Sequence, residues 1–326
     1  MYNAAIVGCG VVGGRLAESF SEHPETTVWG VCDLVESKAE SFAAEYDARA
    51  FTDYREMIRS DEVDVVYVGV PPTVHREVVT FALEHDRHTI CEKPIAEDAA
   101  EGARMVALER ETDRETAVNL PFRYTPGFVE MRERVEAGEI GAPKRVTLDF
   151  RFPQWPREWQ DVAWLRSREQ GGPIREVGTH FLFGVQELFG PIERVNATVS
   201  YSGPDAYEDS VVGYFEVDGV HGTIDLLCDH EQDEENSITV VGTESELTLV
   251  EWYRLLENRE QDDEAVLNED REQTTLTLVD EFVTAMDGGD AELVSFAEAT
   301  RVQRVVDAVF DSAGGTVEIR ADSRVE

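Results

Sequence analysis

Lysine is almost missing from this chain, and positive charge in general is scarce. Of the 326 residues, 29 are Lys or Arg and 68 are Asp or Glu, which gives a formal net charge of −39. The lysines number three: Lys38, Lys93 and Lys144. Because nucleic acids and anionic membranes attract basic patches, this composition argues against both as partners.

The acidic residues are spread through segments whose periodic pattern is typical of folded structure, and they are not gathered in a tail. Abundant carboxylate with very little lysine is typical of proteins from salt-loving microbes. In about 1 M salt the Debye length is about 3 Å, so repulsion between carboxylates is screened. We therefore expect a halophilic protein that needs high salt.

Long apolar runs and closely spaced cysteines are missing too. No stretch of about 18 apolar residues is present, so we expect no membrane-spanning helix. Met1 leads directly into the apolar segment 4–7 without the basic start of a signal peptide, so we expect a cytoplasmic protein. The four cysteines lie far apart in the sequence: Cys9, Cys32, Cys91 and Cys228. Without a C-x-x-C pair, we expect neither a disulfide framework nor a metal site.

The length and the pattern of apolar residues predict two domains. Up to residue 119, strand-like and helix-like segments alternate, which predicts a doubly wound parallel sheet. After that, strand-like segments dominate and predict a large, mostly antiparallel open sheet. We expect a dinucleotide-binding Rossmann domain over residues 1–121 and a substrate-binding and oligomerisation α/β domain over residues 122–326. The acidic segment 257–270 is expected to be a solvated loop.

One broad face of the second sheet is expected to lack a cover of helices. Another subunit often covers such a face. We therefore expect a homodimer or homotetramer formed through the C-terminal sheet.

A glycine motif follows the first predicted strand. Residues 8–13 read Gly-Cys-Gly-Val-Val-Gly, a G-x-G-x-x-G between a predicted strand and a predicted helix. Glycines permit a tight turn and a close approach of the backbone to a pyrophosphate at the helix N-terminus. The motif in this setting predicts dinucleotide binding, and a plain strand-to-helix turn is the alternative. The residues expected to contact the cofactor are Gly8, Gly10, Val11, Val12 and Gly13.

A carboxylate ends the second predicted strand. Asp33 lies about twenty residues after Gly13, where an acidic side chain binds the hydroxyls of the adenine ribose. A carboxylate repels the 2′-phosphate of NADP, so Asp33 favours NAD. Lys38 is close enough in sequence to offset part of this repulsion, which leaves NADP open.

One of the three lysines lies at the end of a predicted buried strand, in the sequence Cys91-Glu92-Lys93-Pro94. The carboxyl ends of parallel strands are where an open α/β sheet presents side chains to a ligand, so we take Lys93 as the chemical centre. Glu92, Pro71 and His75 are expected to face the cofactor as well. For His75 a structural role is the alternative.

A second polar group lies further along the chain. Glu176 and His180 are four residues apart in a helix predicted to start after Gly171-Gly172-Pro173, so both point the same way. They can act as a base and the group that orients it, and a surface pair is the alternative. Upstream lie three tryptophans: Trp155, Trp159 and Trp164. They suit a wall for sugar rings, and a packing cluster is the alternative.

Together these motifs resemble those of the Gfo/Idh/MocA family of nicotinamide-dependent sugar and polyol oxidoreductases. The resemblance covers nearly the whole chain. It rests on Gly8-x-Gly10-x-x-Gly13, Pro71-Pro72-x-x-His75, Glu92-Lys93-Pro94, Gly138-Glu139-Ile140-Gly141, and Gly171-Gly172 leading to Gly178-x-His180. It implies a Rossmann domain followed by an α/β domain with a large open sheet. It also implies hydride transfer between NAD or NADP and a sugar, cyclitol or related polyol.

The resemblance implies roles for single residues. The family's catalytic Lys, Asp and His map onto Lys93, Glu176 and His180, with Glu where Asp is usual. We expect His180 to act as the base, Glu176 to orient it, and Lys93 to donate to the substrate oxygen. Asn119 and Arg123 match the family's stretch after the last parallel strand, where substrate contacts are common. The expected substrate contacts are Lys93, Asn119, Arg123, Trp155, Trp164 and His180.

Two other classes of function stay open. One is a dinucleotide-binding sensor without turnover. The other is a member of the same fold that uses NAD for hydrolysis or elimination without net redox change.

Overall fold

The computed structural model describes residues 1–326 apart from 161, 232, 260–264, 271–272 and 321–326. Contacts between Cα atoms divide it into two compact units. Unit 1 holds Met1–Pro121 and Gln273–Thr300, and unit 2 holds the described residues of 122–272 and 301–324. The division expected at residue 121 placed 273–300 with the second domain, whereas these residues contact unit 1.

Unit 1 is built on a six-stranded parallel sheet with the strand order β3-β2-β1-β4-β5-β6. Its central strands are buried on both faces, which is why they appear in the sequence as short runs of Val, Ile and Ala. The order reverses between β1 and β4, which makes this the switch point of the sheet. The strands are β1 Tyr2–Val7, β2 Thr26–Cys32, β3 Arg49–Phe51, β4 Val65–Val68, β5 His88–Glu92 and β6 Thr116–Asn119.

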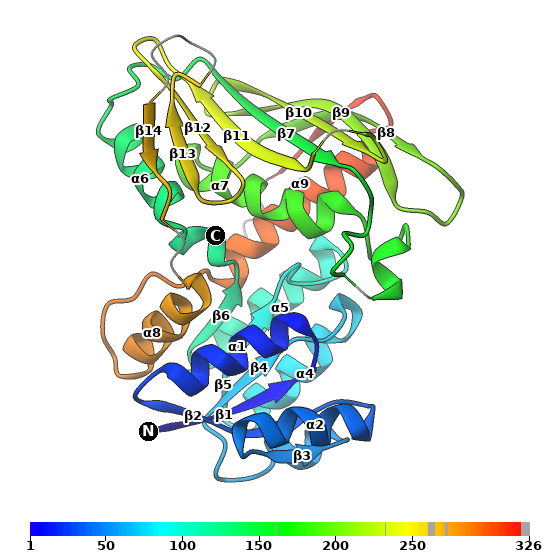
Figure 1. Cartoon of the computed structure of the whole chain (residues 1–326), viewed down its shortest axis with the longest axis vertical. Coiled ribbons are helices and arrows are strands. Elements are labelled where there is room, and N and C mark those ends of the chain that lie inside the picture. Colours follow the sequence, from blue (N-terminus) through cyan, green and yellow to red (C-terminus); the bar gives the residue numbers. More distant parts are fainter. Residues whose placement is uncertain (161, 232, 260–264, 271–272, 321–326) are drawn as a thin grey trace. The chain divides into compact units, whose positions relative to one another are not determined.

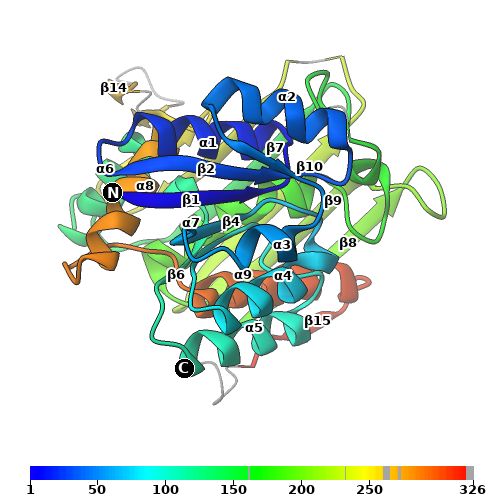
Figure 2. The ribbon, with the colours of Figure 1, turned by 90° about the horizontal axis from the view of Figure 1, so that it is seen from below.

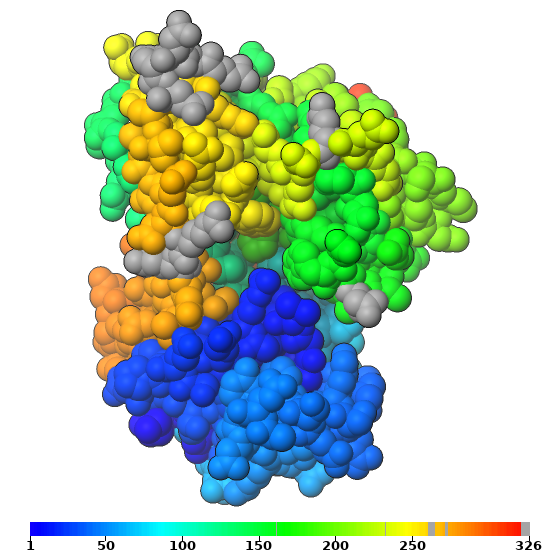
Figure 3. Space-filling view, in the orientation of Figure 1, coloured from blue at the N-terminus to red at the C-terminus, as the bar shows by residue number. Residues whose placement is uncertain are grey.

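Helices cover both faces of this sheet. Figure 2 shows α1 and α2 on one face and α4 and α5 on the other. The helices of unit 1 are α1 Val11–Glu22, α2 Glu36–Tyr46, α3 Tyr54–Ile58, α4 Pro72–Glu84, α5 Ala99–Glu111 and α8 Thr274–Met286. Helix α8 lies against α1 (Figure 3). There the Ser19 hydroxyl donates to Thr275 Oγ1 at 2.9 Å. This contact explains why the late segment 273–300 belongs to unit 1.

Unit 2 is built on a nine-stranded sheet in the order β14-β13-β12-β11-β7-β10-β9-β8-β15. Adjacent strands in this sheet pair antiparallel, except β7 and β10, which pair parallel. The strands are β7 Arg145–Phe152, β8 Arg194–Tyr201, β9 Glu208–Val217, β10 Val220–Cys228, β11 Glu235–Val241, β12 Glu246–Val250, β13 Arg254–Glu257, β14 Ala265–Asn268 and β15 Thr316–Glu318.

One face of this sheet is buried. Along β7, Val146, Leu148, Phe150 and Phe152 are buried and alternate with partly exposed residues. Helices α6 (Pro126–Glu136) and α7 (Thr179–Phe189) lie on the buried side (Figure 1), where the Phe181 and Phe150 rings pack at 5.1 Å. Helix α9 spans Phe296–Asp311, and short 3₁₀ helices span Pro121–Tyr124 and Ala163–Arg166.

The predicted fold class is confirmed: a parallel doubly wound sheet followed by a mostly antiparallel one. The expectation of a plain loop over 257–270 is wrong in part, because β14 pairs with β13 there. None of the side chains of β14 is buried, so its sequence lacks the apolar alternation that reveals a strand. The part of that loop over 260–264 lies outside the described residues.

Three observations concern membrane helices, metal sites and cysteines, which the sequence raised. Among the residues that the structure describes, no helix has the length and apolar character needed to cross a membrane. Within the same residues, no group of three or more His, Cys, Asp or Glu side chains is placed to hold a metal ion. The four cysteines are all buried free thiols.

Candidate active site

The glycine turn between β1 and α1 leaves no room for side chains on one side and is open on the other. Gly8 has φ +107°, and a Cβ there would lie 2.1 Å from the carbonyl oxygen of Gly69. A Cβ on Gly13 would lie 2.1 Å from the carbonyl oxygen of Gly8. At Gly10 nothing lies within 4 Å of an added Cβ, and α1 begins there without a side-chain cap. This open, uncapped helix start fits a pyrophosphate.

Asp33 stands at the carboxyl end of β2, beside the glycine turn. Its Oδ2 accepts from the backbone N–H of Cys9 at 3.2 Å, and its Oδ1 accepts from the N–H of Val35 at 2.9 Å. The carboxylate is thus tied to the turn that would hold the pyrophosphate, and its remaining lone pairs are available to ribose hydroxyls. Leu34, the next residue, is 92% exposed, and its apolar side chain carries no hydrogen-bond donor for a 2′-phosphate. The residues of unit 1 therefore fit a dinucleotide.

The segment that carries Lys93 is held by its neighbour Glu92. Glu92 Oε2 accepts from the Tyr67 hydroxyl at 2.7 Å and from the Asn119 side-chain amide at 2.8 Å. Burial, and next the charge of Glu92, raise the pKa of Tyr67 well above its ordinary value, so Tyr67 stays a proton donor. Three adjacent strands thus converge on one carboxylate, which fixes partly buried Lys93 at the carboxyl edge of the sheet.

Tyr67 was missed from the sequence. Its only signal there is a hydroxyl inside the otherwise apolar β4. Asn119, expected to contact substrate, is 2% exposed and lies in the same network, so the described contact is with Glu92. Its role toward a substrate stays a prediction.

His75 is fully buried in the first turn of α4. Its Nε2 lies 2.7 Å from the carbonyl oxygen of Val70, and its Nδ1 lies 3.3 Å from that of Ile95. Burial lowers the pKa of the imidazole. The ring joins the loop after β4 to the segment after Lys93, and these contacts favour the structural role of His75. Pro71 is the exposed N-cap of α4, and its cofactor contact stays a prediction.

In unit 2 the helix expected from residue 173 begins with a π turn over Ile174–Gly178 and continues as α7. The Thr179 hydroxyl donates to the carbonyl oxygen of Arg175 at 2.8 Å and so satisfies a group in the widened turn. Turns of this kind frequently occur at functional sites. Glu176 lies within the π turn, and His180 lies two residues beyond its last residue, Gly178.

The surroundings of Glu176 and His180 are partly polar and partly aromatic. Glu176 Oε1 accepts from the side-chain amide of Gln160 at 3.4 Å. His180 is 7% exposed, and its ring lies 5.1 Å from that of Trp252 at an angle of 83°. Trp252 was missed because nothing local in the sequence places the β12–β13 connection beside residue 180.

Trp155 and Arg123 are buried within unit 2. Trp155 is 2% exposed and its indole N–H donates to the carbonyl oxygen of Leu165 at 3.1 Å, which favours the packing alternative for this tryptophan. Arg123 Nη2 lies 2.9 Å from Glu187 Oε2 on α7. Trp164 is partly buried and Trp159 is 51% exposed. Substrate contacts from Arg123 and Trp164 stay predictions.

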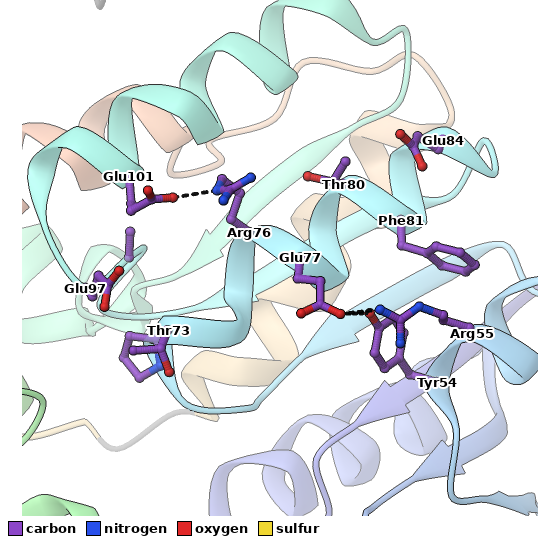
Figure 4. A pocket seen from close by; sticks show the side chains of 12 residues that line it. Tyr54, Arg55, Thr73, Arg76, Glu77, Thr80, Phe81, Glu84, Glu97 and Glu101 are labelled. Carbon is purple, nitrogen blue, oxygen red and sulfur yellow. Dashed lines mark hydrogen bonds and ion pairs between the residues drawn. The ribbon is translucent and has the colours of Figure 1, made fainter.

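A pocket of about 430 Å³ lies elsewhere in unit 1, among α3, α4 and the start of α5 (Figure 4). Arg55 pairs with Glu77 and Arg76 pairs with Glu101 across it. Its cations already face carboxylates, so the pocket does not suit a phosphate. Among the described residues, none of the predicted site residues lines this pocket. The lining consists of Tyr54, Arg55, Pro72, Thr73, Arg76, Glu77, Thr80, Phe81, Glu84, Ala96, Glu97 and Glu101.

Two family models match the chain. One, described as "Oxidoreductase family, NAD-binding Rossmann fold", matches residues 2–120. The other, the GFO/IDH/MocA C-terminal domain, matches residues 128–248. Together they cover about three quarters of the chain.

Curated relatives share part of the sequence. A dTDP-3,4-didehydro-2,6-dideoxy-alpha-D-glucose 3-reductase of Saccharopolyspora spinosa is 30% identical over 193 residues, 57% of this chain and 57% of that protein. An inositol 2-dehydrogenase of Salmonella typhimurium is 32% identical over 150 residues, 44% of each chain. The chain therefore spans about half the length of these relatives.

Structural similarity covers more of the chain than these sequence matches do. A levoglucosan dehydrogenase, solved with NADH and L-sorbose, matches with a TM-score of 0.88 and covers 98% of this chain and 99% of its own. At 19% identity this likeness shows the fold alone.

Proposed function

The chain belongs to the Gfo/Idh/MocA family of oxidoreductases, and from that premise we propose an NAD(P)-dependent dehydrogenase or reductase acting on CH–OH groups. It transfers a hydride between the nicotinamide cofactor and a sugar, a cyclitol or a related polyol or keto sugar. The observation that carries the proposal is the carboxyl edge of the unit 1 sheet. There the glycine turn, Asp33 and Lys93 follow β1, β2 and β5, on both sides of the switch point. The activities named for the two curated relatives, on a dTDP-sugar and on inositol, support the substrate class.

The cofactor we propose is NAD, with NADP as the second choice. The glycine turn would hold the pyrophosphate at the start of α1, and Asp33 would bind the ribose hydroxyls. The nicotinamide, when bound, accepts or gives a hydride. Support for NAD comes from the fixed carboxylate of Asp33 and from exposed Leu34, whose side chain offers a 2′-phosphate no hydrogen-bond donor.

The chemical roles follow from the side chains. Lys93 would donate to the substrate oxygen and stabilise developing alkoxide. His180 would take the hydroxyl proton, and Glu176 would orient its imidazole and stabilise the cationic form. In reduction the proton moves the other way. Arg123 and Trp164 would contribute substrate contacts.

The experiment that tests this function follows the absorbance of reduced nicotinamide in molar KCl. The protein would be incubated with NAD or NADP and a panel of aldoses, inositols and sugar acids. In the reverse direction it would be incubated with the reduced cofactors and keto sugars. A rate with one pair supports the proposal. Cofactor binding by calorimetry without any rate would favour the sensor, and product release without net change in NADH would favour non-redox chemistry.

We further propose a homodimer or homotetramer formed through the open face of the unit 2 sheet. On β9 of that face, Val212 and Tyr214 are each 59% exposed, and Leu227 on the adjacent strand is 42% exposed. Light scattering in molar KCl would measure the mass of wild type and of Tyr214→Asp. A monomeric wild type contradicts the proposal.

The halophilic character and a cytoplasmic location are proposals as well. The first is supported by the net charge of −39 and the second by four unpaired thiols, which suit a reducing compartment.

A further inference from the structure

A carboxylate is buried where β9 begins, next to the helix that carries His180. Glu208 is 0% exposed. Its Oε1 accepts from the backbone N–H of Ile174, the first residue of the π turn, at 2.7 Å. Its Oε2 is buried without a hydrogen-bond partner among the described residues. Burying a carboxylate with one satisfied oxygen is costly, so an acid at this position needs a reason.

Gly172 lies directly against this carboxylate. It has φ +98°, and a Cβ there would lie 2.2 Å from Glu208 Oε2 and 2.6 Å from Oε1. A Cβ on Gly171 would lie 2.3 Å from the carbonyl oxygen of Leu165. The two glycines therefore let the chain pass between a carboxylate and a backbone carbonyl, which gives the Gly171-Gly172 motif a physical reason.

The other groups around Glu208 do not replace this contact. Arg175 Nη1 donates to the carbonyl oxygens of Arg168 and Gly171 at 3.2 and 3.3 Å, and its guanidinium lies 4.1 Å from the Phe310 ring centre. Cys228 Sγ lies 3.9 Å from the backbone oxygen of Glu208. The carboxylate thus acts on the start of the π turn itself.

We propose that Glu208 is a positioning residue that anchors Gly172–Ile174 and thereby sets where the π turn and α7 hold Glu176 and His180. The hydrogen bond fixes the first amide of the π turn, and the carboxylate fills the space that only glycine leaves free. The catalytic consequence rests on the proposed function. The anchoring itself does not, and can be measured without turnover.

The test compares Glu208→Ala, Glu208→Gln and Gly172→Ala by hydrogen exchange over residues 171–189, with the whole chain in molar KCl. Glu208→Ala should speed exchange at the start of this segment about tenfold or more, because Ile174 loses its acceptor. Glu208→Gln keeps an acceptor oxygen of the same size and should stay near wild type. Gly172→Ala should reproduce the effect of Glu208→Ala, since its methyl group would displace the carboxylate.

Gly190→Ala is the matched control. Gly190 ends the same helix with φ +85°, but nothing lies within 4 Å of an added Cβ. Gly190→Ala therefore shows the effect of placing alanine at a positive φ without a clash between the added Cβ and a neighbouring group. In a Glu208→Ala background the added methyl of Gly172→Ala has room, so the two effects should be strongly non-additive. If Glu208→Ala does not fold, Glu208→Gln and Gly172→Ala carry the test.

A second readout separates positioning from general stability. The imidazole ¹H–¹⁵N signals of His180 should shift in Glu208→Ala and Gly172→Ala and return in Glu208→Gln, while those of buried His75 in unit 1 stay in place. Unchanged exchange and unchanged His180 signals in Glu208→Ala, or additive effects of the two substitutions, overturn the proposal. A wild type without turnover on the sugar panel contradicts the proposed function, and the exchange pattern then still decides the anchoring.

Discussion

Single residues carry the chemistry we propose, and the structure shows how some of them are held. The Glu92 carboxylate accepts hydrogen bonds from Tyr67 and Asn119. The Asp33 carboxylate accepts hydrogen bonds from the N–H groups of Cys9 and Val35. Such support keeps a reacting or binding group in one geometry before the ligand arrives, which lowers the cost of reaching the transition state.

Lys93→Met and His180→Ala should each lower turnover about a hundredfold or more, because a proton donor or acceptor is lost from the transition state. NAD should still bind with nearly unchanged affinity by calorimetry. Lys144→Met is the control, since Lys144 is an exposed lysine of unit 2. Near-normal turnover in both site variants contradicts the assigned roles.

Asp33→Ser should weaken NAD binding roughly tenfold or more, because the charged acceptor for the ribose hydroxyls is lost. It should also raise the preference for NADP, because the repulsion of the 2′-phosphate disappears. Calorimetric titration of both cofactors measures the ratio. The control is Asp61→Ser at an exposed acid of the same unit. An unchanged ratio of the two affinities means that Asp33 does not set cofactor choice.

At the scale of elements, the helix after Gly171-Gly172 shows what sequence can and cannot predict. Its presence and its end at Gly190 could be predicted from local residues. Pro favours the first turn of a helix and Gly the position after its last residue, whatever the tertiary structure around them. The π turn and its anchor could not be predicted, since they depend on Glu208, far away in sequence. A glutamate opening a strand gives no sign that it will be buried.

The parallel sheet of unit 1 was predictable for the opposite reason. Its central strands are buried on both faces, so each appears as an uninterrupted apolar run. β3 and β14 lack that signal, and the return of α8 to α1 is a tertiary contact that no local pattern contains. Likewise, the burial of Trp155 and the closeness of Trp252 to His180 depend on packing between distant segments.

The anchored helix predicts a pH effect on stability. Burial raises the pKa of Glu208 to about 7 from its ordinary 4.5, against the lowering effects of the Ile174 N–H and of Arg175; Asp209 and Cys228 also lie near. The folded state therefore holds this proton more tightly than the unfolded state. Relative to Glu208→Gln, wild type should lose about 3 kcal/mol of stability as pH rises from about 4.5 through about 7.

Urea unfolding of both proteins at pH 5 and pH 8 in molar KCl measures this difference. The free energies of unfolding should diverge toward higher pH, with wild type falling relative to the variant. Parallel pH profiles contradict a titrating Glu208.

On the scale of the whole molecule, charge is the dominant feature. With 68 acidic and 29 basic residues, self-repulsion is strong in dilute buffer. Raising KCl from about 0.1 M to above 1 M shortens the Debye length from about 10 Å to about 3 Å and should raise the melting temperature markedly. Differential scanning calorimetry across this range measures the shift. Equal melting temperatures at both concentrations contradict a need for high salt.

Hydride transfer to the nicotinamide is the central claim for the whole protein, and one isotope measurement tests it most directly. The protein would be incubated in molar KCl with NAD and a panel of carbon-deuterated inositols and hexoses, and the cofactor analysed by mass spectrometry. We predict that the reduced cofactor carries deuterium with at least one member of the panel, and that the label appears about a hundredfold or more slowly with Lys93→Met. A cofactor that binds but stays unlabelled with every member would contradict the account.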